Sequence, residues 1–198
     1  MKVVFFFAII IAGAFVQSAQ SESKAAKKAD KVQFQTVEWT DLMPEADLQA
    51  ILNPPAYLSE IEDGSEDDIL GSQLRAAAGM SASDARYHQA LVSKEVIPEF
   101  DGRDIRIPGF IVPLEYDDEQ TVTTFFLVPF FGACIHVPPP PPNQIIYAEY
   151  EPGLRLDALY DPFWISGKLS TTLVENNVAT SAYAISVSSI EIYEDEPE

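Results

Sequence analysis

The sequence predicts a mainly β protein with a helical N-terminal part, an α+β chain whose β portion closes into a small OB-like barrel. Five stretches in its second half are rich in β-branched and aromatic residues. The first of them carries Pro108-Gly109 near its centre, which favours a bend or bulge in a strand that curves around a barrel. A longer connection separates the third stretch from the fourth. A small β-sandwich is the alternative.

The N-terminus has the pattern of a secretory signal peptide over residues 1–21. Lys2 is followed by an apolar run, Val3 to Val16, which is shorter than the roughly 20 residues that a spanning helix needs. Small residues favour cleavage between Ala19 and Glu22. Residues 22–33, rich in Ser, Ala and Lys, predict a flexible linker. We therefore expect a periplasmic or secreted protein.

Residues 34–94 predict the helical N-terminal part. A short strand is expected from Phe34 to Trp39. Asp41 is the expected cap of a first helix that carries a weak apolar stripe. A second helix is expected from about residue 81 to residue 93, because Ser81 and Asp84 resemble a capping box. His88 is predicted to lie on the polar side of that helix.

Residues 95–193 predict the OB-like β-domain. A strand at Val96–Phe100 and a tight turn at Asp101-Gly102 are expected before the barrel strands. Pro152-Gly153 is expected to turn the chain after the third barrel strand. The barrel strands are expected at residues 105–114, 121–131, 144–150, 163–169 and 181–193. The second of them is apolar on both faces near its end, which predicts burial on both sides. Core positions are expected for Phe125, Phe126, Phe130, Phe131 and Trp164.

Charge is strongly segregated in this chain, whose net charge is −19. Four lysines lie between residues 24 and 31, whereas from residue 32 onward seven Lys and Arg residues face 29 Asp and Glu residues, a net charge of −22. This excess of negative charge argues against nucleic acid as a partner of the folded part. It favours a solvated acidic surface, with weak attraction of divalent cations as the alternative.

The stretch that concentrates chemical groups is residues 130–144. It contains the single cysteine, Cys134, together with His136 and five consecutive prolines. If this stretch is extended, Cys134 and His136 point to the same face. The prolines predict a polyproline II rod of about 15 Å. The exported chain cannot form an internal disulfide, so its lone thiol suggests a role other than cross-linking.

Three interpretations of this stretch compete. A thiolate and an imidazole suit zinc or copper, so Cys134 and His136 are candidate metal ligands, with His88, Glu149 or another carboxylate as the further ligand. Alternatively, Cys134, His136 and either Asn143 or Gln144 resemble the nucleophile, base and orienting residue of a thiol-dependent hydrolase or transferase.

The third interpretation is structural or recognitive. Cys134 would pack, His136 would bond a backbone group, and the loop would dock a protein partner. Its binding residues would be Pro138, Pro139, Pro140, Pro141, Pro142, Asn143 and Gln144. The sequence favours a metal or recognition centre over catalysis.

Several motifs resemble a bacterial family of exported proteins that is classed only as a domain of unknown function. They are Pro-Gly-Phe-Ile-Val-Pro-Leu-Glu at 108–115, Phe-Leu-Val-Pro at 126–129 and the Cys-x-His-polyproline-Asn-Gln signature within residues 132–144. The opening Trp39-x-Asp41-Leu42-x-Pro44 is also similar, and the resemblance covers residues 37–193.

The resemblance implies a small exported protein and no assigned activity. Some members are encoded beside ABC-type permeases of the lipoprotein-release and macrolide-export kind, or in zinc-responsive clusters. We therefore expect an exported soluble accessory of an envelope transport system. Its centre at Cys134 and His136 would bind zinc, copper or an envelope protein partner such as a transporter component.

Overall fold

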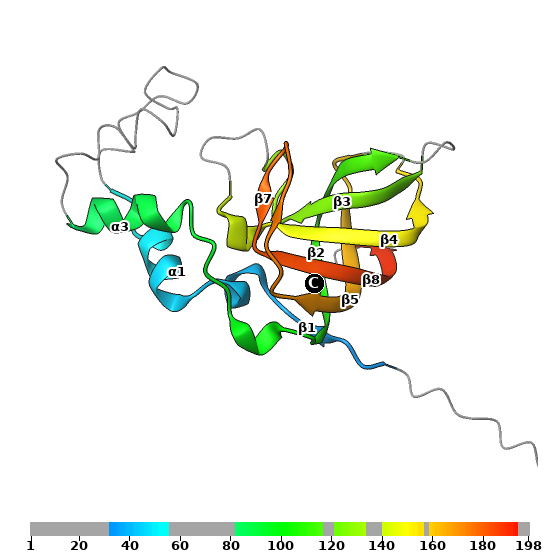
Figure 1. The fold of residues 1–198 in the computed structure, drawn as a ribbon, viewed down its shortest axis with the longest axis horizontal. Helices are drawn as coiled ribbons and strands as arrows, with labels where there is room; N and C mark the ends of the chain where they lie inside the picture. Colours follow the sequence, from blue (N-terminus) through cyan, green and yellow to red (C-terminus); the bar gives the residue numbers. More distant parts are fainter. Residues whose placement is uncertain (1–31, 56–81, 117–120, 134–139, 157–158, 194–198) are drawn as a thin grey trace, which may run out of the picture. The chain divides into compact units, whose positions relative to one another are not determined.

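The computed structural model describes residues 32–55, 82–116, 121–133, 140–156 and 159–193, which are coloured in Figure 1. The predicted signal peptide and all but the last two residues of the predicted linker lie outside these ranges. The described residues belong to one compact unit that spans residues 32–198. None of the helices within the described ranges is long and apolar enough to cross a membrane.

Five long strands form a closed barrel. They are β2 (Asp104–Tyr116), β3 (Val122–Val128), β4 (Ile146–Leu154), β5 (Pro162–Ser170) and β8 (Tyr183–Ile192). Hydrogen bonds join them in the order β2-β3-β4-β8-β5, and β5 pairs back onto β2. The β4–β8 pair is parallel and the other barrel pairs are antiparallel. The predicted OB-like barrel is thus confirmed, because the β2–β5 pairing closes the ring that a sandwich would leave as two sheets.

Strand β2 closes the barrel by pairing with two neighbours. It pairs with β5 from Asp104 to Phe110 and with β3 from Phe110 to Tyr116. The change of partner falls beside the predicted bend at Pro108-Gly109. The β2–β5 register has no shift at this dipeptide, and a Cβ atom on Gly109 would lie 2.8 Å from the carbonyl oxygen of Val128. Glycine is therefore needed here because β2 and β3 approach closely, and not because the strand has a bulge.

The barrel interior follows the period-two alternation of its strands. Ile105, Ile107 and Ile111 of β2 alternate inward, and Phe125 and Leu127 of β3 meet them in the core. The intervening residues of β3, Phe126 and Val128, are also fully buried and belong to a second apolar cluster with Ala133 and Ile145. The prediction that this strand is buried on both faces is confirmed.

The N-terminal segment lies against the barrel through short elements. Strand β1 (Gln35–Thr36) pairs in parallel with β2, which confirms a short strand in this region. A 3-10 helix, η1 (Trp39–Leu42), follows, and then α1 (Glu45–Leu52) begins after Pro44. The prediction that Asp41 caps the first helix was wrong. Asp41 lies within η1, where its carboxylate accepts a hydrogen bond from the Glu38 N–H at 3.0 Å.

Helix α3 (Ala82–Ala90) confirms the second predicted helix and packs against α1. The position predicted for His88 was wrong, because its side chain is 3% exposed. Its neighbours Tyr87, Ala90 and Leu91 are buried as well, so this end of the helix is covered over a broad face.

Two local predictions in the β region also failed. The expected strand at Val96–Phe100 is replaced by a 3-10 helix, η4 (Pro98–Phe100), because Pro98 has no N–H for a strand ladder. Pro152-Gly153 lies inside β4, where a register shift against β3 accommodates Gly153 at φ +72°. A small hairpin of β6 (Val174–Glu175) and β7 (Thr180–Ser181) was not expected.

Candidate functional site

The predicted centre is only partly described. Cys134, His136, Pro138 and Pro139 lie outside the described residues. The end of the motif is described: Pro140 and Pro141 are buried, and residues Pro142–Gln144 form the 3-10 helix η5.

Asn143 is completely buried and joins three parts of the chain. Its side-chain amide nitrogen donates to the Glu95 carbonyl oxygen at 3.0 Å and to the Asp47 carboxylate at 3.4 Å. Its backbone N–H donates to the carbonyl oxygen of Ser93 at 3.3 Å. Within the described ranges, its side-chain oxygen has no hydrogen-bond partner. Asn143, predicted to bind a partner or to orient a catalytic base, thus holds α1 and the segment after α3 against η5.

Gln144 has a similar place beside it. Its amide nitrogen donates to the Trp39 carbonyl oxygen at 2.8 Å and to the Asn143 carbonyl oxygen at 3.0 Å. The side chain is 8% exposed and lines a cleft described below. Gln144 therefore connects η5 to η1.

Asp47 and Tyr183 complete this group of buried polar side chains. Asp47, 1% exposed, forms an ion pair with Arg86 of α3. The Tyr183 hydroxyl donates to the Leu42 carbonyl oxygen at 2.9 Å and accepts from the Ile97 N–H at 2.7 Å. Burial raises the pKa of Tyr183 above its ordinary value. We call Asp47, Asn143, Gln144 and Tyr183 the polar hub.

An apolar cleft of about 300 Å³ lies beside the polar hub. Both described ends of the predicted loop line it, with Phe130 on one side of residues 134–139 and Pro140-Pro141 on the other. We call it the loop cleft. Helices α1 and α3 supply much of the remaining wall, and the full lining is Thr40, Met43, Leu48, Ile51, Leu52, Tyr87, Leu91, Pro129, Phe130, Pro140, Pro141 and Gln144.

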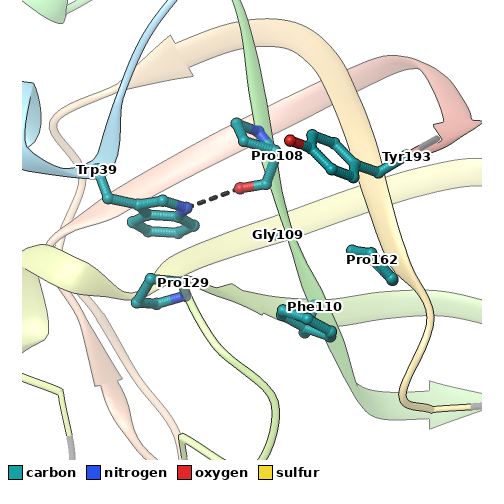
Figure 2. Close-up of a pocket in the computed structure, with 7 residues that line it drawn as sticks. All are labelled: Trp39, Pro108, Gly109, Phe110, Pro129, Pro162 and Tyr193. Atoms are coloured by element: carbon teal, nitrogen blue, oxygen red, sulfur yellow. Dashed lines mark hydrogen bonds between the residues drawn. The ribbon is translucent and has the colours of Figure 1, made fainter. Parts of the chain in front are cut away.

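A second cleft, of about 240 Å³, lies at the point where β2 changes partner (Figure 2). The Trp39 indole Nε1–H donates to the Pro108 carbonyl oxygen at 2.7 Å, which fixes the ring at one side of the cleft. Gly109 of β2 lies between the walls, and a Cβ atom on it would meet Leu127 and Val128 of β3. We call this the aromatic cleft, and its lining is Trp39, Pro108, Gly109, Phe110, Pro129, Pro162 and Tyr193.

The aromatic residues only partly follow the sequence prediction. Phe125 and Phe126 are fully buried, as expected, but Phe130 is 43% exposed and Phe131 is 53% exposed. Phe131 contacts Phe110 of the aromatic cleft, with 6.2 Å between ring centroids. Sequence reasoning missed Trp39 and Tyr193 as lining residues. The Trp39-x-Asp41-Leu42-x-Pro44 motif was the available signal for Trp39.

The two further metal ligands considered from the sequence lie on different elements. His88 is buried in α3, with its ring centroid 5.7 Å from that of Tyr87. Glu149 is exposed on β4, and its carboxylate accepts a hydrogen bond from the Tyr147 hydroxyl at 3.2 Å. Burial and the charge of Glu149 raise the pKa of Tyr147. Among the side chains that the structure describes, no group of three or more His, Cys, Asp or Glu residues could hold a metal ion.

Most of the cations in the described part are paired with carboxylates. Arg86 pairs with Asp47, and Arg106 pairs with Glu191 at 3.1 Å while its guanidinium lies 4.3 Å from the Trp164 ring centroid. Two further pairs, Lys94–Glu175 and Lys168–Asp104, are 3.1 and 3.0 Å long. These pairs leave the acidic excess of the chain largely uncompensated.

Comparisons with known proteins place this chain in a family. Residues 39–192 match the family model described as protein of unknown function, DUF3299. The chain is similar to the crystal structure of a DUF3299 family protein from Pseudomonas aeruginosa PAO1, with 32% sequence identity and a TM-score of 0.59. That similarity covers 83% of this chain and 99% of the other. The comparison with curated proteins found no match. The chain therefore belongs to the DUF3299 family.

Proposed function

We propose that this chain is an exported binding protein that serves as an accessory of an envelope transport system and recognises an envelope protein through the loop cleft. One observation carries the proposal: Phe130 and Pro140-Pro141, on either side of residues 134–139, line the same apolar cleft. The most unusual stretch of the sequence thus begins and ends at a concave apolar surface. Such surfaces are the common sites of ligand and peptide binding.

The surroundings of this cleft support recognition more than catalysis. Phe130 and Leu52, which line it, are 43% and 63% exposed, and large apolar side chains gathered at a surface are typical of interaction sites. Asn143, the candidate orienting residue of a thiol enzyme, already donates to Glu95 and Asp47. The predicted signal peptide supports a partner in the envelope.

Photocross-linking in the producing cell tests this proposal. A benzophenone amino acid placed at Leu52 should capture one protein of the envelope, to be identified by mass spectrometry. The matched control is Val178, which is 56% exposed in the β6–β7 connection and lines neither of the two clefts. Capture of the same proteins at both positions, or capture only of cytoplasmic proteins, would contradict the proposal.

A metal at the same loop is the second proposal. Cys134 and His136 are a thiol and an imidazole donor for zinc or copper, and buried His88 follows Tyr87, which lines the loop cleft. Elemental analysis of untagged protein should then find zinc or copper, and both Cys134→Ser and His136→Ala should lose it. A metal-free wild type, or unchanged metal content in both variants, would contradict metal binding and leave peptide recognition unaffected.

A further inference from the structure

The two clefts are neighbouring parts of one surface. Pro129 lines both of them. Trp39 of the aromatic cleft accepts, through its carbonyl oxygen, a hydrogen bond from Gln144 of the loop cleft at 2.8 Å. Trp39 and Thr40, adjacent in the chain, line one cleft each. The relative position of the clefts is therefore set by a shared wall and a buried hydrogen bond.

Each cleft alone is small. Their volumes, about 240 and about 300 Å³, lie at or below the lower end of the range of about 300–1,000 Å³ that is usual for small-molecule sites. Each has room for a few apolar side chains. The exposed pair Phe130-Phe131 links them, because Phe130 lines the loop cleft and Phe131 contacts Phe110 of the aromatic cleft.

The walls of the aromatic cleft match an extended, proline-containing chain. Figure 2 shows Trp39 and Pro129 on one side of β2 and Tyr193 and Pro162 on the other, with Gly109 between them. Grooves between aromatic rings are the usual docking sites of polyproline II segments, which are already ordered before they bind. The indole N–H is engaged with Pro108, so Trp39 offers mainly its ring face.

Charge identifies the flanks of the ligand. None of the described residues that line the two clefts is charged, but the exposed carboxylates of Glu38, Asp41 and Glu45 follow one another along the same segment as Trp39 and Thr40. The nearby cations Arg86 and Arg106 are paired with carboxylates. From residue 32 onward the net charge is −22. A segment with an apolar middle and basic ends complements this surface.

We infer that the aromatic cleft and the loop cleft together bind one continuous extended peptide segment of a partner protein, whose proline and large apolar residues fill the clefts and whose flanking Lys or Arg residues pair with the exposed carboxylates of Glu38, Asp41 and Glu45. The inference rests on the proposed recognition role of the loop cleft and names the partner's chemistry. The partner segment is expected to be basic because this part of the chain is acidic. It is expected to be continuous because Pro129 forms a wall of both clefts.

Selection from a random peptide library tests the inference. Phage-displayed peptides of about 12 residues, about 37 Å long as polyproline II, would be panned against the purified mature protein. We expect enrichment of peptides that combine proline or large apolar residues with a surplus of Lys and Arg. Enrichment of acidic or uncharged peptides, or no enrichment, would overturn the inference.

Binding of one selected peptide, labelled with fluorescein, would then be measured by anisotropy. Leu52→Ser in the loop cleft and Tyr193→Ala in the aromatic cleft should each weaken binding about fivefold or more, as truncation of an interface anchor does. Val178→Ser is the matched control and should leave binding unchanged. Binding should also weaken between about 0.1 M and about 1 M salt, over which the Debye length falls from about 10 Å to about 3 Å.

The outcomes separate the inference from the proposed function. If Leu52→Ser weakens binding and Tyr193→Ala does not, the loop cleft recognises its ligand alone and the two-cleft inference is wrong while the proposed function stands. If neither variant weakens binding, neither cleft is the binding site, and both the two-cleft inference and the proposed function are wrong. Unchanged affinity in high salt would overturn the assignment of basic flanks. Unchanged melting temperatures of the variants would show that the losses are local.

Discussion

The barrel interior and the polar hub are held by different kinds of contact. In the barrel, Phe125, Leu127 and Ile146 pack against other apolar side chains, and the contact is stabilised because all of them are removed from water. In the hub, Asp47, Asn143 and Gln144 each meet particular donors and acceptors at hydrogen-bond distance. Apolar packing accepts several residues of similar size, whereas a buried amide needs its own partners.

This difference matters for the candidate site because the hydrogen bonds of the hub join η1, α1 and η5 around the loop cleft, whereas the barrel core reaches only η1 among these elements, through Leu42 and Trp39. Loss of a barrel residue should weaken the whole unit, whereas loss of a hub residue should weaken mainly the attachment of the helical segment. The two tryptophans can report on this difference separately, since Trp39 lies in η1 and Trp164 in β5.

The largest effect is expected from Phe125→Ala, which removes a fully buried ring from the barrel. Such truncations lower the free energy of unfolding by about 3–5 kcal/mol. Urea denaturation followed by circular dichroism would measure the loss. The control Phe131→Ala removes the same ring at a position that is 53% exposed and should change stability by less than about 1 kcal/mol. Equal losses in the two variants would contradict the assignment of the core.

Asn143→Ala is expected to have the next largest effect. It leaves the Glu95 carbonyl oxygen without this donor and removes one contact of the buried Asp47 carboxylate, at a cost of about 1–3 kcal/mol. Measured in Trp164→Phe protein, the Trp39 fluorescence transition should shift to lower urea concentration. In Trp39→Phe protein, the Trp164 transition should shift less. Coincident shifts would show that the hub and the barrel unfold as one.

Tyr183→Phe should cost about 1 kcal/mol, because the hydroxyl connects Leu42 and Ile97. Its folded-state pKa is raised by burial, so the tyrosine contribution to stability is complete below the ordinary pKa of about 10 and is lost as pH rises above it. The difference between wild type and variant should therefore shrink above about pH 10. A constant difference across that range, measured by urea denaturation, would contradict the burial of this hydroxyl.

The smallest effect is expected from Lys94→Ala. The Lys94–Glu175 pair is exposed, and such pairs contribute about 0–1 kcal/mol. Thermal denaturation of wild type and variant should nearly coincide, and the small difference should vanish in high salt because exposed charges are screened. A loss as large as that of Asn143→Ala would show that the connection between residue 94 and the β6–β7 hairpin is part of the hub.

The sequence was a good guide to the barrel and a poor one to the site. Alternation in β2 and β8 is a local property, since each strand shows its inward and outward faces within a few residues. The exposure of Phe130 and Phe131 could not be predicted from the sequence. An aromatic residue in an apolar run gives the same sequence pattern whether or not another segment of the chain covers it.

The sequence by itself determined the approximate positions of the five barrel strands, the closed barrel as the favoured fold and the acidic character of the chain, because these depend on periodicity, turn residues and composition. Only the tertiary structure decided that Asn143 and Gln144 join η5 to the helical segment, that His88 is buried and that Trp39 and Tyr193 line one cleft. These roles depend on contacts between residues 48 to 105 positions apart, such as Asn143 with Glu95 and Gln144 with Trp39, which no local pattern records.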